Sequence, residues 1–377
     1  MSFLRQFRTL AATLGTFLLL APAGCAPITS APVPVPPAAG PTVYPATEWE
    51  HVASPETAGW SSAGLDSVRA ALAALPSTGF IAVVGGRVLM EYGDLDSLSY
   101  LASVRKSVLS MLFGNYVASG AIRLERTLAE IGIDDIGGLD PEEKRATVRD
   151  LLMARSGIFH AAANGGDDLA SAPPRGSQAP GSYYLYSNWD FNALGTIFER
   201  ATGRGIYDAL ESDLAGPIGM QDWRRDLQVR TGDTTRSVHK AYHMWLSTRD
   251  MARIGYLMLR EGNWNGRQLV PRDWVRESTR AHTPVNEMNP ERRRAAPFGY
   301  GYLWWVWDGP WAAGLYRGAY TGLGAVGQHI SILPELDLVV AHKTAPGGAG
   351  SVTHPQYLEV LQLLVRAHCG QGNCGQR

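Results

Sequence analysis

The chain has 377 residues, of which 45% are hydrophobic and 18% are charged. This size and composition predict a globular protein with a large core, built as one domain or as two closely packed subdomains. The 34 Lys and Arg residues nearly balance the 35 Asp and Glu residues, giving a formal net charge of -1. With no basic tract either, the sequence argues against nucleic-acid binding.

The first 25 residues have the organisation of an export signal. Arg5 and Arg8 give a positive start, and the apolar run from Leu10 to Leu20 is too short to span a membrane. Ala21-Pro22-Ala23 fits a plain cleavage site, whereas Gly24-Cys25 resembles the end of a bacterial lipoprotein signal, in which Cys25 becomes lipidated. The sequence leaves both processing routes open.

A Pro- and Ala-rich run over residues 26–50 has the composition of a flexible tether. The tether favours lipidation, so we expect an exported protein of the bacterial periplasm that is anchored to the membrane through Cys25. Cys369 and Cys374 lie close together in the sequence and predict a disulfide bond in an oxidising compartment. We expect the main domain over residues 55–367 and a C-terminal tail over residues 368–377.

Taken in chain order, the first ordered elements are a helix, a hairpin and a second helix. Apolar residues recur at helical spacing from Leu65 to Leu75. The β-prone runs Phe80 to Val84 and Arg87 to Tyr92 surround Gly85-Gly86, which predicts a hairpin. A helix follows from Ser103 and ends near Gly120, and its small residues predict burial on several sides.

The middle of the chain is predicted to consist of helices and loops. Thr147 to Asp150 and Ser247 to Asp250 resemble capping boxes, which begin helices. Residues 161–181 form a loop rich in Gly, Pro, Ser and Ala, and loops of that length in compact domains are often functional.

Strands return near the end of the chain, followed by a helix over about residues 356–367. The predicted strands cover residues 300–307, 328–333 and 336–341, and a turn at Pro334-Glu335 joins the last two in a second predicted hairpin. This order predicts an α+β fold, in which an antiparallel sheet built from both chain ends is flanked by helices and a mostly helical subdomain is inserted.

Ser103 and Lys106 are the first candidates for catalysis. Residues three apart share a face of a helix with a rise of about 4.5 Å, and a lysine amine can help remove the proton from a serine hydroxyl. The same S-x-x-K pattern recurs at Ser237 to Lys240. Tyr186 and Asn188 form a second group, on a loop that leads into a predicted helix.

An S-x-x-K motif, then a Y-x-N motif, then an x-T-G strand is the motif order of the serine β-lactamase and penicillin-binding-protein superfamily. The third motif here is Tyr320-Thr321-Gly322, followed by Leu323. The chain most resembles the class C-related branch, which includes esterases, D-amino-acid peptidases and hydrolases of the 6-aminohexanoate-dimer type. The same order places Ser237 to Lys240 after the Y-x-N motif, which excludes it as the nucleophile.

The resemblance implies the β-lactamase/transpeptidase-like fold and a serine hydrolase that needs no metal and no organic cofactor. Ser103 would attack an ester or amide carbonyl, while Lys106 and Tyr186 together would accept and return the proton. Asn188 would orient Lys106 and the substrate. The substrate strand Tyr320, Thr321, Gly322 and Leu323 would bind the oxyanion through one backbone N–H, which we assign to Leu323, together with the N–H of Ser103.

One position departs from the pattern of β-lactamases and transpeptidases, which usually carry a lysine where Tyr320 stands. That lysine helps to hold the carboxylate of the substrate, so its absence favours an esterase or amidase. Lys343-Thr344 comes after the final strand and lacks the glycine, and we interpret it as a coincidence.

Each candidate also has a structural interpretation. Ser103 and Asn188 could be helix caps and Tyr186 a core aromatic. Trp304, Trp305 and Trp307 suggest a substrate platform, but consecutive aromatic residues in a strand mostly pack, and we interpret them as packing residues. His160, His239 and His243 lack the spacing of metal ligands, and no G-x-S-x-G is present.

The leading expectation is therefore an exported serine hydrolase that cleaves a small ester or amide through an acyl-serine intermediate. One alternative is a peptidase or amidase that acts on D-amino-acid or cell-wall peptides. Another is a non-hydrolytic envelope sensor of the penicillin-binding type.

Overall fold

The structure is a computed structural model that describes residues 42–344 and 350–369. The chain divides into two units, Met1–Pro34 and Val35–Arg377, and every described residue belongs to the second. The predicted export signal with Cys25, most of the predicted tether, and Cys374 lie outside the described residues. The lipidation, the pairing of Cys369 with Cys374 and the domain boundaries therefore stay predictions.

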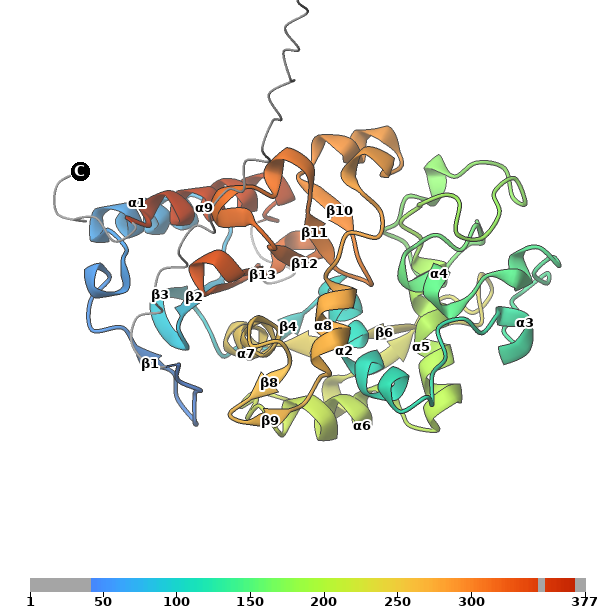
Figure 1. The fold of residues 1–377 in the computed structure, drawn as a ribbon, viewed down its shortest axis with the longest axis horizontal. Coiled ribbons are helices and arrows are strands. Elements are labelled where there is room, and N and C mark those ends of the chain that lie inside the picture. Colours follow the sequence, from blue (N-terminus) through green and yellow to red (C-terminus); the bar gives the residue numbers. More distant parts are fainter. Residues whose placement is uncertain (1–41, 345–349, 370–377) are drawn as a thin grey trace, which may run out of the picture. The chain divides into compact units, whose positions relative to one another are not determined.

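An eight-stranded sheet forms the centre of this unit (Figure 1). Its strands are Glu50–His51 (β1), Gly79–Val84 (β2), Arg87–Gly93 (β3), Phe298–Tyr300 (β10), Trp305–Trp307 (β11), Tyr320–Gly324 (β12), Gln328–Leu333 (β13) and Leu338–Lys343 (β14). They lie in the order β1-β3-β2-β14-β13-β12-β11-β10, and only the pair β1 with β3 is parallel. Because β2 pairs with β14, strands from both ends of the sequence meet in one sheet, as predicted.

Two predicted hairpins of this sheet are confirmed. Gly85 and Gly86 join β2 to β3 with φ angles of 60° and 85°, a left-handed conformation that glycine adopts without steric cost. A short turn over Pro334–Leu336 joins β13 to β14. Local turn chemistry thus sets the register of four strands.

The single strand predicted over residues 300–307 is wrong. These residues belong to two antiparallel strands, β10 and β11, because the chain reverses at Leu303, whose φ is 65°. Leu303 also leaves the sheet: its N–H donates to Leu152 O at 3.2 Å, and its carbonyl accepts from Ser107 Oγ at 2.8 Å. The pairing of β11 therefore stops at Trp305.

Helices cover both faces of the sheet. The described α-helices are Ser62–Ala73 (α1), Val104–Ala118 (α2), Leu128–Ile131 (α3), Val148–Leu152 (α4), Asn188–Thr202 (α5), Ile206–Leu210 (α6), Thr248–Leu259 (α7), Arg272–Ser278 (α8) and His354–Ala367 (α9). Helices α1 and α9 pack side by side, and Tyr357 of α9 donates to Ser331 of β13 at 2.7 Å. Helix α7 covers the opposite face, where Gly255 approaches Ile330, the neighbour of Ser331 along the strand.

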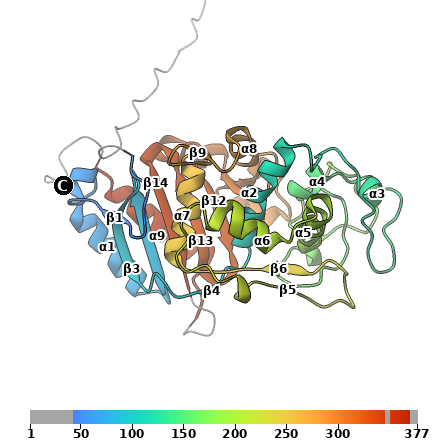
Figure 2. The same cartoon turned by 90° about the horizontal axis from the view of Figure 1, so that it is seen from below.

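The segment between β3 and β10 contains the predicted helical insertion. Its helices α3, α4 and α5 lie at the opposite end from α1 in both views (Figures 1 and 2). Thr147 and Asp150 form the predicted capping box before α4. The box predicted at Ser247 is only half present, because the Asp250 carboxylate accepts instead from the backbone of Gln221 and Asp222.

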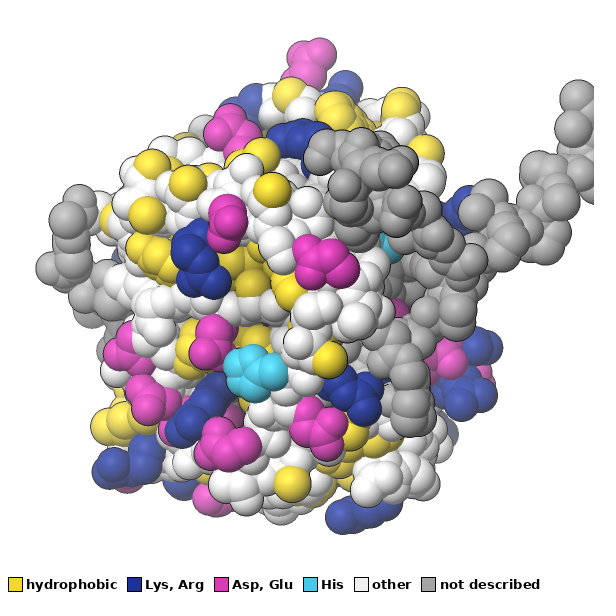
Figure 3. All heavy atoms as spheres, turned by 90° about the vertical axis from the view of Figure 1, so that its left-hand side faces the viewer, with side chains coloured by type: hydrophobic (Ala, Val, Ile, Leu, Met, Phe, Trp, Pro, Cys, Tyr) yellow, Lys and Arg dark blue, Asp and Glu magenta, His cyan; other side chains and the backbone are white. Residues whose placement is uncertain are grey.

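The charged side chains on the surface agree with the near balance of acidic and basic residues in the sequence. Figure 3 shows one face, on which acidic and basic side chains are interspersed, as the formal net charge of -1 suggests. Among residues 42–344 and 350–369, no helix combines the length and the apolar character needed to cross a bilayer.

Candidate active site

Ser103 stands at the start of α2, a helix whose residues from Val104 to Gly114 are all buried. Ala102 precedes it with a φ of 50°, so the chain turns sharply into the helix. The Ser103 hydroxyl makes no capping hydrogen bond. The hydroxyl therefore has no structural task at the helix start and is available for chemistry.

One buried amine connects the four residues predicted to be catalytic. Lys106 Nζ lies 3.0 Å from Ser103 Oγ, 2.6 Å from Tyr186 OH and 2.7 Å from Asn188 Oδ1. The Lys106 side chain is 1% exposed. A surface lysine would keep its amine in water, so this placement needs a compensating function.

Burial favours the uncharged forms of both proton carriers. It lowers the pKa of the Lys106 amine well below its usual value, and the Arg105 guanidinium lowers it further. Burial also raises the pKa of the Tyr186 phenol. An uncharged amine has a lone pair that can accept a proton, and the hydrogen bond of 2.6 Å between Lys106 Nζ and Tyr186 OH couples the two groups. The pair can thus take the proton that Ser103 loses on attack.

Asn188 holds Lys106 in position. It is the first residue of α5, and its Nδ2 donates to Gly165 O at 2.7 Å, which directs Oδ1 to Lys106. Its backbone N–H donates to the Asp167 carboxylate at 3.1 Å. The predicted functional loop over residues 161–181 therefore contributes by fixing the Y-x-N motif, although no residue in it was singled out.

Two charged residues that the sequence did not reveal cover Tyr186. The Cζ atom of Arg293 lies 5.4 Å from the centroid of the Tyr186 ring, and its Nε donates to Asp168 Oδ2 at 2.7 Å. Asp168 is buried, and its own N–H donates to Tyr186 O at 2.9 Å. Arg293 and Asp168 are separated by 125 positions, so only the fold could bring them together.

Strand β12 supplies the second group expected to bind the oxyanion. Alternate residues of a strand direct their N–H and C=O groups to the same neighbouring strand. The Ala319 carbonyl accepts from the N–H of Trp307 in β11, so Ala319 directs its backbone groups to β11. Thr321 and Leu323 share this direction, but the register with β11 ends at the pair Trp305 and Thr321. In that register Leu303 would be the next partner, opposite Leu323. The backbone N–H and carbonyl of Leu303 are instead hydrogen-bonded to residues of helices α4 and α2. On this side Leu323 has no strand partner within the described chain, which leaves its N–H for a ligand.

Two glycines bring this N–H close to the nucleophile. A Cβ at Gly322 would come within 3.2 Å of Ser107 Oγ, one turn along α2 from Ser103. A Cβ at Gly324 would come within 2.8 Å of the backbone two residues before Ser103. Larger residues would push β12 away from the start of α2. Leu323, between the two glycines, is therefore held beside Ser103.

The side chains of Tyr320 and Thr321 have packing roles. Tyr320 meets the Trp304 ring edge-on at 5.3 Å between centroids. Thr321 is buried, with Oγ1 3.0 Å from Ser331 Oγ. The structure thus brings Ser103, Lys106, Tyr186 and Asn188 together, while the substrate strand contributes backbone rather than these two side chains. No cation stands at position 320 to hold a carboxylate.

The other serine and lysine patterns are structural. The Ser237 hydroxyl is buried and donates to Asp135, while Lys240 is exposed. Lys343 donates to Ser99 O at 3.1 Å from a buried position, where burial lowers its pKa to about 7. No contact joins either lysine to Ser103 in the described chain.

The remaining candidates have ordinary roles or lie elsewhere. His239 Nδ1 lies 3.0 Å from Thr196 Oγ1, and within the described ranges no group of three His, Cys, Asp or Glu residues could hold a metal ion.

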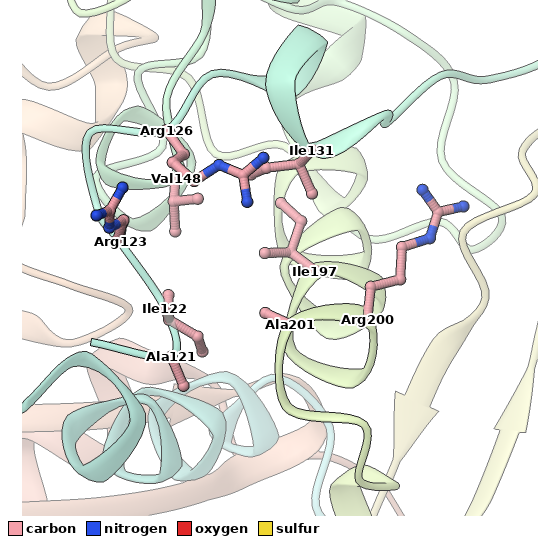
Figure 4. Close-up of a pocket in the computed structure, with 9 residues that line it drawn as sticks. All are labelled: Ala121, Ile122, Arg123, Arg126, Ile131, Val148, Ile197, Arg200 and Ala201. Carbon is pink, nitrogen blue, oxygen red and sulfur yellow. The ribbon is translucent and has the colours of Figure 1, made fainter. Parts of the chain in front are cut away.

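Figure 4 shows a pocket that is lined by none of Ser103, Lys106, Tyr186 and Asn188. Arg123, Arg126 and Arg200 surround it, but the Arg200 guanidinium points away, so the three cations do not converge.

The comparisons with known proteins agree with this geometry. The Beta-lactamase family model matches residues 65–347. The chain belongs to the beta-lactamase family. Its members have the β-lactamase/transpeptidase-like fold seen here, a large sheet flanked by helices.

Curated relatives of the chain include hydrolases of two kinds. The chain is 32% identical to the 6-aminohexanoate-dimer hydrolase of Paenarthrobacter ureafaciens over 167 residues, and 30% identical to Esterase EstB of Burkholderia gladioli over 165 residues. These alignments cover 44% and 36% of this chain and 40% of each relative. An uncharacterized protein of Alkalihalophilus pseudofirmus is 24% identical over 265 residues, 65% of this chain and 72% of that protein.

Solved structures show the same fold at low identity. A penicillin-binding-protein homologue from Caulobacter crescentus matches with a TM-score of 0.59 and 16% identity, covering 81% of this chain and 97% of that one. A family VIII carboxylesterase matches with a TM-score of 0.57 and 15% identity, covering 82% and 99%. The family is therefore one of β-lactamase-fold hydrolases with esterase and amidase relatives.

Proposed function

We propose that the protein is an exported serine hydrolase that cleaves a small ester or amide through an acyl-Ser103 intermediate. One observation carries this proposal: the Lys106 amine is buried and lies within hydrogen-bond distance of Ser103 Oγ, Tyr186 OH and Asn188 Oδ1. A nucleophile beside a base that a third group orients is the arrangement that covalent catalysis requires.

Acylation begins when Ser103 Oγ attacks the carbonyl carbon and its proton passes to the pair of Lys106 and Tyr186. The carbonyl oxygen becomes an oxyanion, which the N–H groups of Ser103 and Leu323 stabilise. The start of α2 also favours negative charge there. The intermediate then collapses, the bond to the leaving group breaks, and the pair returns the proton to the departing alcohol or amine.

Deacylation repeats these steps with water. The pair takes a proton from water as its oxygen attacks the acyl carbon, and it returns that proton to Ser103 Oγ as the ester bond breaks. The acid product leaves, and every group regains its starting protonation state. These steps need proton transfer and charge stabilisation only, both of which the chain's own residues can provide.

The preference for simple esters or amides over β-lactams rests on position 320. A tyrosine packed against Trp304 offers no cation to a substrate carboxylate. The esterase among the curated relatives supports the same choice.

Hydrolysis of p-nitrophenyl acetate and of a chromogenic cephalosporin, by wild type and by Ser103→Ala, tests the proposal. We expect ester turnover that exceeds cephalosporin turnover and falls by about four orders of magnitude in the variant. Equal activity of wild type and Ser103→Ala, with no labelling of either by a serine-reactive phosphonate, would contradict it.

Export is tested separately. We propose that Cys25 carries the lipid, so a Cys25→Ser variant should move from the membrane fraction to the soluble envelope fraction. Unchanged fractionation would contradict the anchor and leave the catalytic proposal intact.

A further inference from the structure

An aromatic pocket of about 640 Å³ lies beside the strand that carries the proposed oxyanion donor. Strands β10, β11 and β12 contribute four of its walls, and two more come from the segments around them. These residues are Arg293, Phe298, Trp305, Trp307, Trp311 and Leu323. Trp305 and Trp307 are buried, whereas Trp311 is 49% exposed and so has apolar surface left for a ligand.

The pocket lies next to the catalytic residues, although none of the four lines it. Its wall Trp305 lies 5.3 Å from the Tyr186 ring, centroid to centroid. Its wall Arg293 lies over both rings, with Cζ 5.4 Å from the centroid of Tyr186 and 5.2 Å from that of Trp305. A third wall, Leu323, carries the proposed oxyanion N–H. A group that projects from Ser103 past Tyr186 therefore comes next to this pocket.

The Tyr186 side is where the leaving group must lie. In the proposed reaction, the departing alcohol or amine takes its proton from Lys106 and Tyr186, so its heteroatom lies within hydrogen-bond reach of that pair. The rest of the leaving group then meets the residues that pack on Tyr186. These are Trp305 and Arg293, which both line the pocket.

The chemistry of the walls favours a flat aromatic ring. Phe298 meets Trp307 edge-on at 5.2 Å, and Trp307 stacks on Tyr316 at 4.4 Å, so the inner wall is an aromatic surface. The Arg293 guanidinium can lie on a further ring as it lies on Trp305. Trp311 at the rim gains burial when a ring enters.

We propose that this pocket binds the leaving group of the substrate and selects an alcohol or amine that carries a flat aromatic ring. The inference rests on the proposed serine hydrolase activity and adds its substrate class. It assigns to Trp305 and Trp307 a contact with substrate in addition to the packing expected from the sequence. Trp304, which is fully buried, keeps the packing role alone.

Esters that share an acetyl group separate recognition from leaving-group reactivity. Benzyl, cyclohexylmethyl and propyl acetate release primary alcohols of similar pKa, and the first two have rings of equal carbon count, so a flat aromatic ring is the main difference between them. We expect kcat/KM for the benzyl ester to exceed that for the cyclohexylmethyl ester by about tenfold, as one or two aromatic contacts provide.

Two variants remove the preference in different ways. Trp311→Ala takes away the exposed rim, and Leu358→Trp fills the pocket from α9. Each should reduce the ratio to about two or less while retaining propyl acetate turnover. Leu227→Ala truncates another exposed apolar side chain, 40% exposed and outside the pocket, and should keep the wild-type ratio.

Equal kcat/KM for the benzyl and cyclohexylmethyl esters in wild type would overturn the inference, as would a wild-type ratio in both pocket variants. Methyl phenylacetate and methyl cyclohexylacetate place the ring on the acyl side. If Trp311→Ala changes only the ratio for this second pair, the assignment to the leaving group is wrong. In all these outcomes propyl acetate is still hydrolysed at Ser103; its complete resistance would overturn the proposed function instead.

Discussion

Replacing Arg293 with glutamine tests whether the guanidinium over Tyr186 sets the pH range of the catalytic pair. Its Cζ lies 5.4 Å from the Tyr186 ring centroid, and its charge lowers the pKa of both Lys106 and Tyr186. At that distance, with an effective dielectric constant of about 20, a unit charge is worth about 3 kcal/mol. The Asp168 carboxylate accepts a hydrogen bond from the same guanidinium, and its negative charge cancels much of this energy. We therefore expect a net effect of about 1.4 kcal/mol on the pair, or about one pKa unit.

The sign follows from the proton-accepting role of the pair. Loss of a nearby positive charge makes proton loss from the pair harder, so its pKa rises and the acid limb of kcat/KM moves about one unit to higher pH. Arg292→Gln is the matched control, since Arg292 binds the same Asp168 but is 63% exposed. Its acid limb should stay within about 0.3 units of wild type. An unmoved limb in Arg293→Gln, or equal movement in both variants, would refute the reasoning.

Three further substitutions separate catalysis from stability. Lys106→Met should lower kcat/KM by about a thousandfold or more, with an equal or higher Tm because no buried amine is desolvated; a Tm that falls with activity would indicate a structural lysine. Ser237→Ala should lose about 1–2 kcal/mol of unfolding free energy with its hydrogen bond to Asp135 and keep kcat/KM within about twofold, and lost turnover at unchanged stability would contradict this. Burial raises the pKa of the Asp190 carboxyl, so the native state keeps its proton longer and wild-type stability falls as pH rises above about 4. Asp190→Asn removes that loss, so its Tm relative to wild type should increase with pH, and a constant difference would be contrary evidence.

Local sequence signals predicted much of the fold. Gly85-Gly86 predicted the first hairpin, because both positions need a left-handed backbone, and β13 and β14 were predicted from the turn at Pro334 that separates them. The strand over residues 300–307 was predicted incorrectly because nothing local marks Leu303 as a reversal. Its left-handed φ is stabilised by Leu152 and Ser107, which are distant in the sequence.

The candidate site could also be predicted only in part from the sequence. Motif order singled out Ser103, Lys106, Tyr186 and Asn188, and the structure places them around one amine. The packing of Thr321 could not be predicted, because only the strand register determines which face its hydroxyl takes.

Asp168 and Arg293, which act through tertiary contacts, could not be singled out, although Asp168 lies within the loop over residues 161–181. Charged residues outside long helices and strands are by default solvated. The position of these two beside Tyr186 depends on how distant segments fold across the site. The tryptophans of strand β11 were interpreted as packing residues rather than as a substrate platform, since aromatic runs in strands are usually core.

The mass of the protein during turnover tests the acyl-Ser103 intermediate most directly. Acid quenching of the reaction with p-nitrophenyl acetate, followed by peptide mapping, locates any covalent acyl group. We predict an acetyl adduct on the peptide that contains Ser103, absent from Ser103→Ala. Substrate consumption with no adduct under conditions that trap other acyl-enzymes, or an adduct on a different residue that persists in Ser103→Ala, would contradict the central claim.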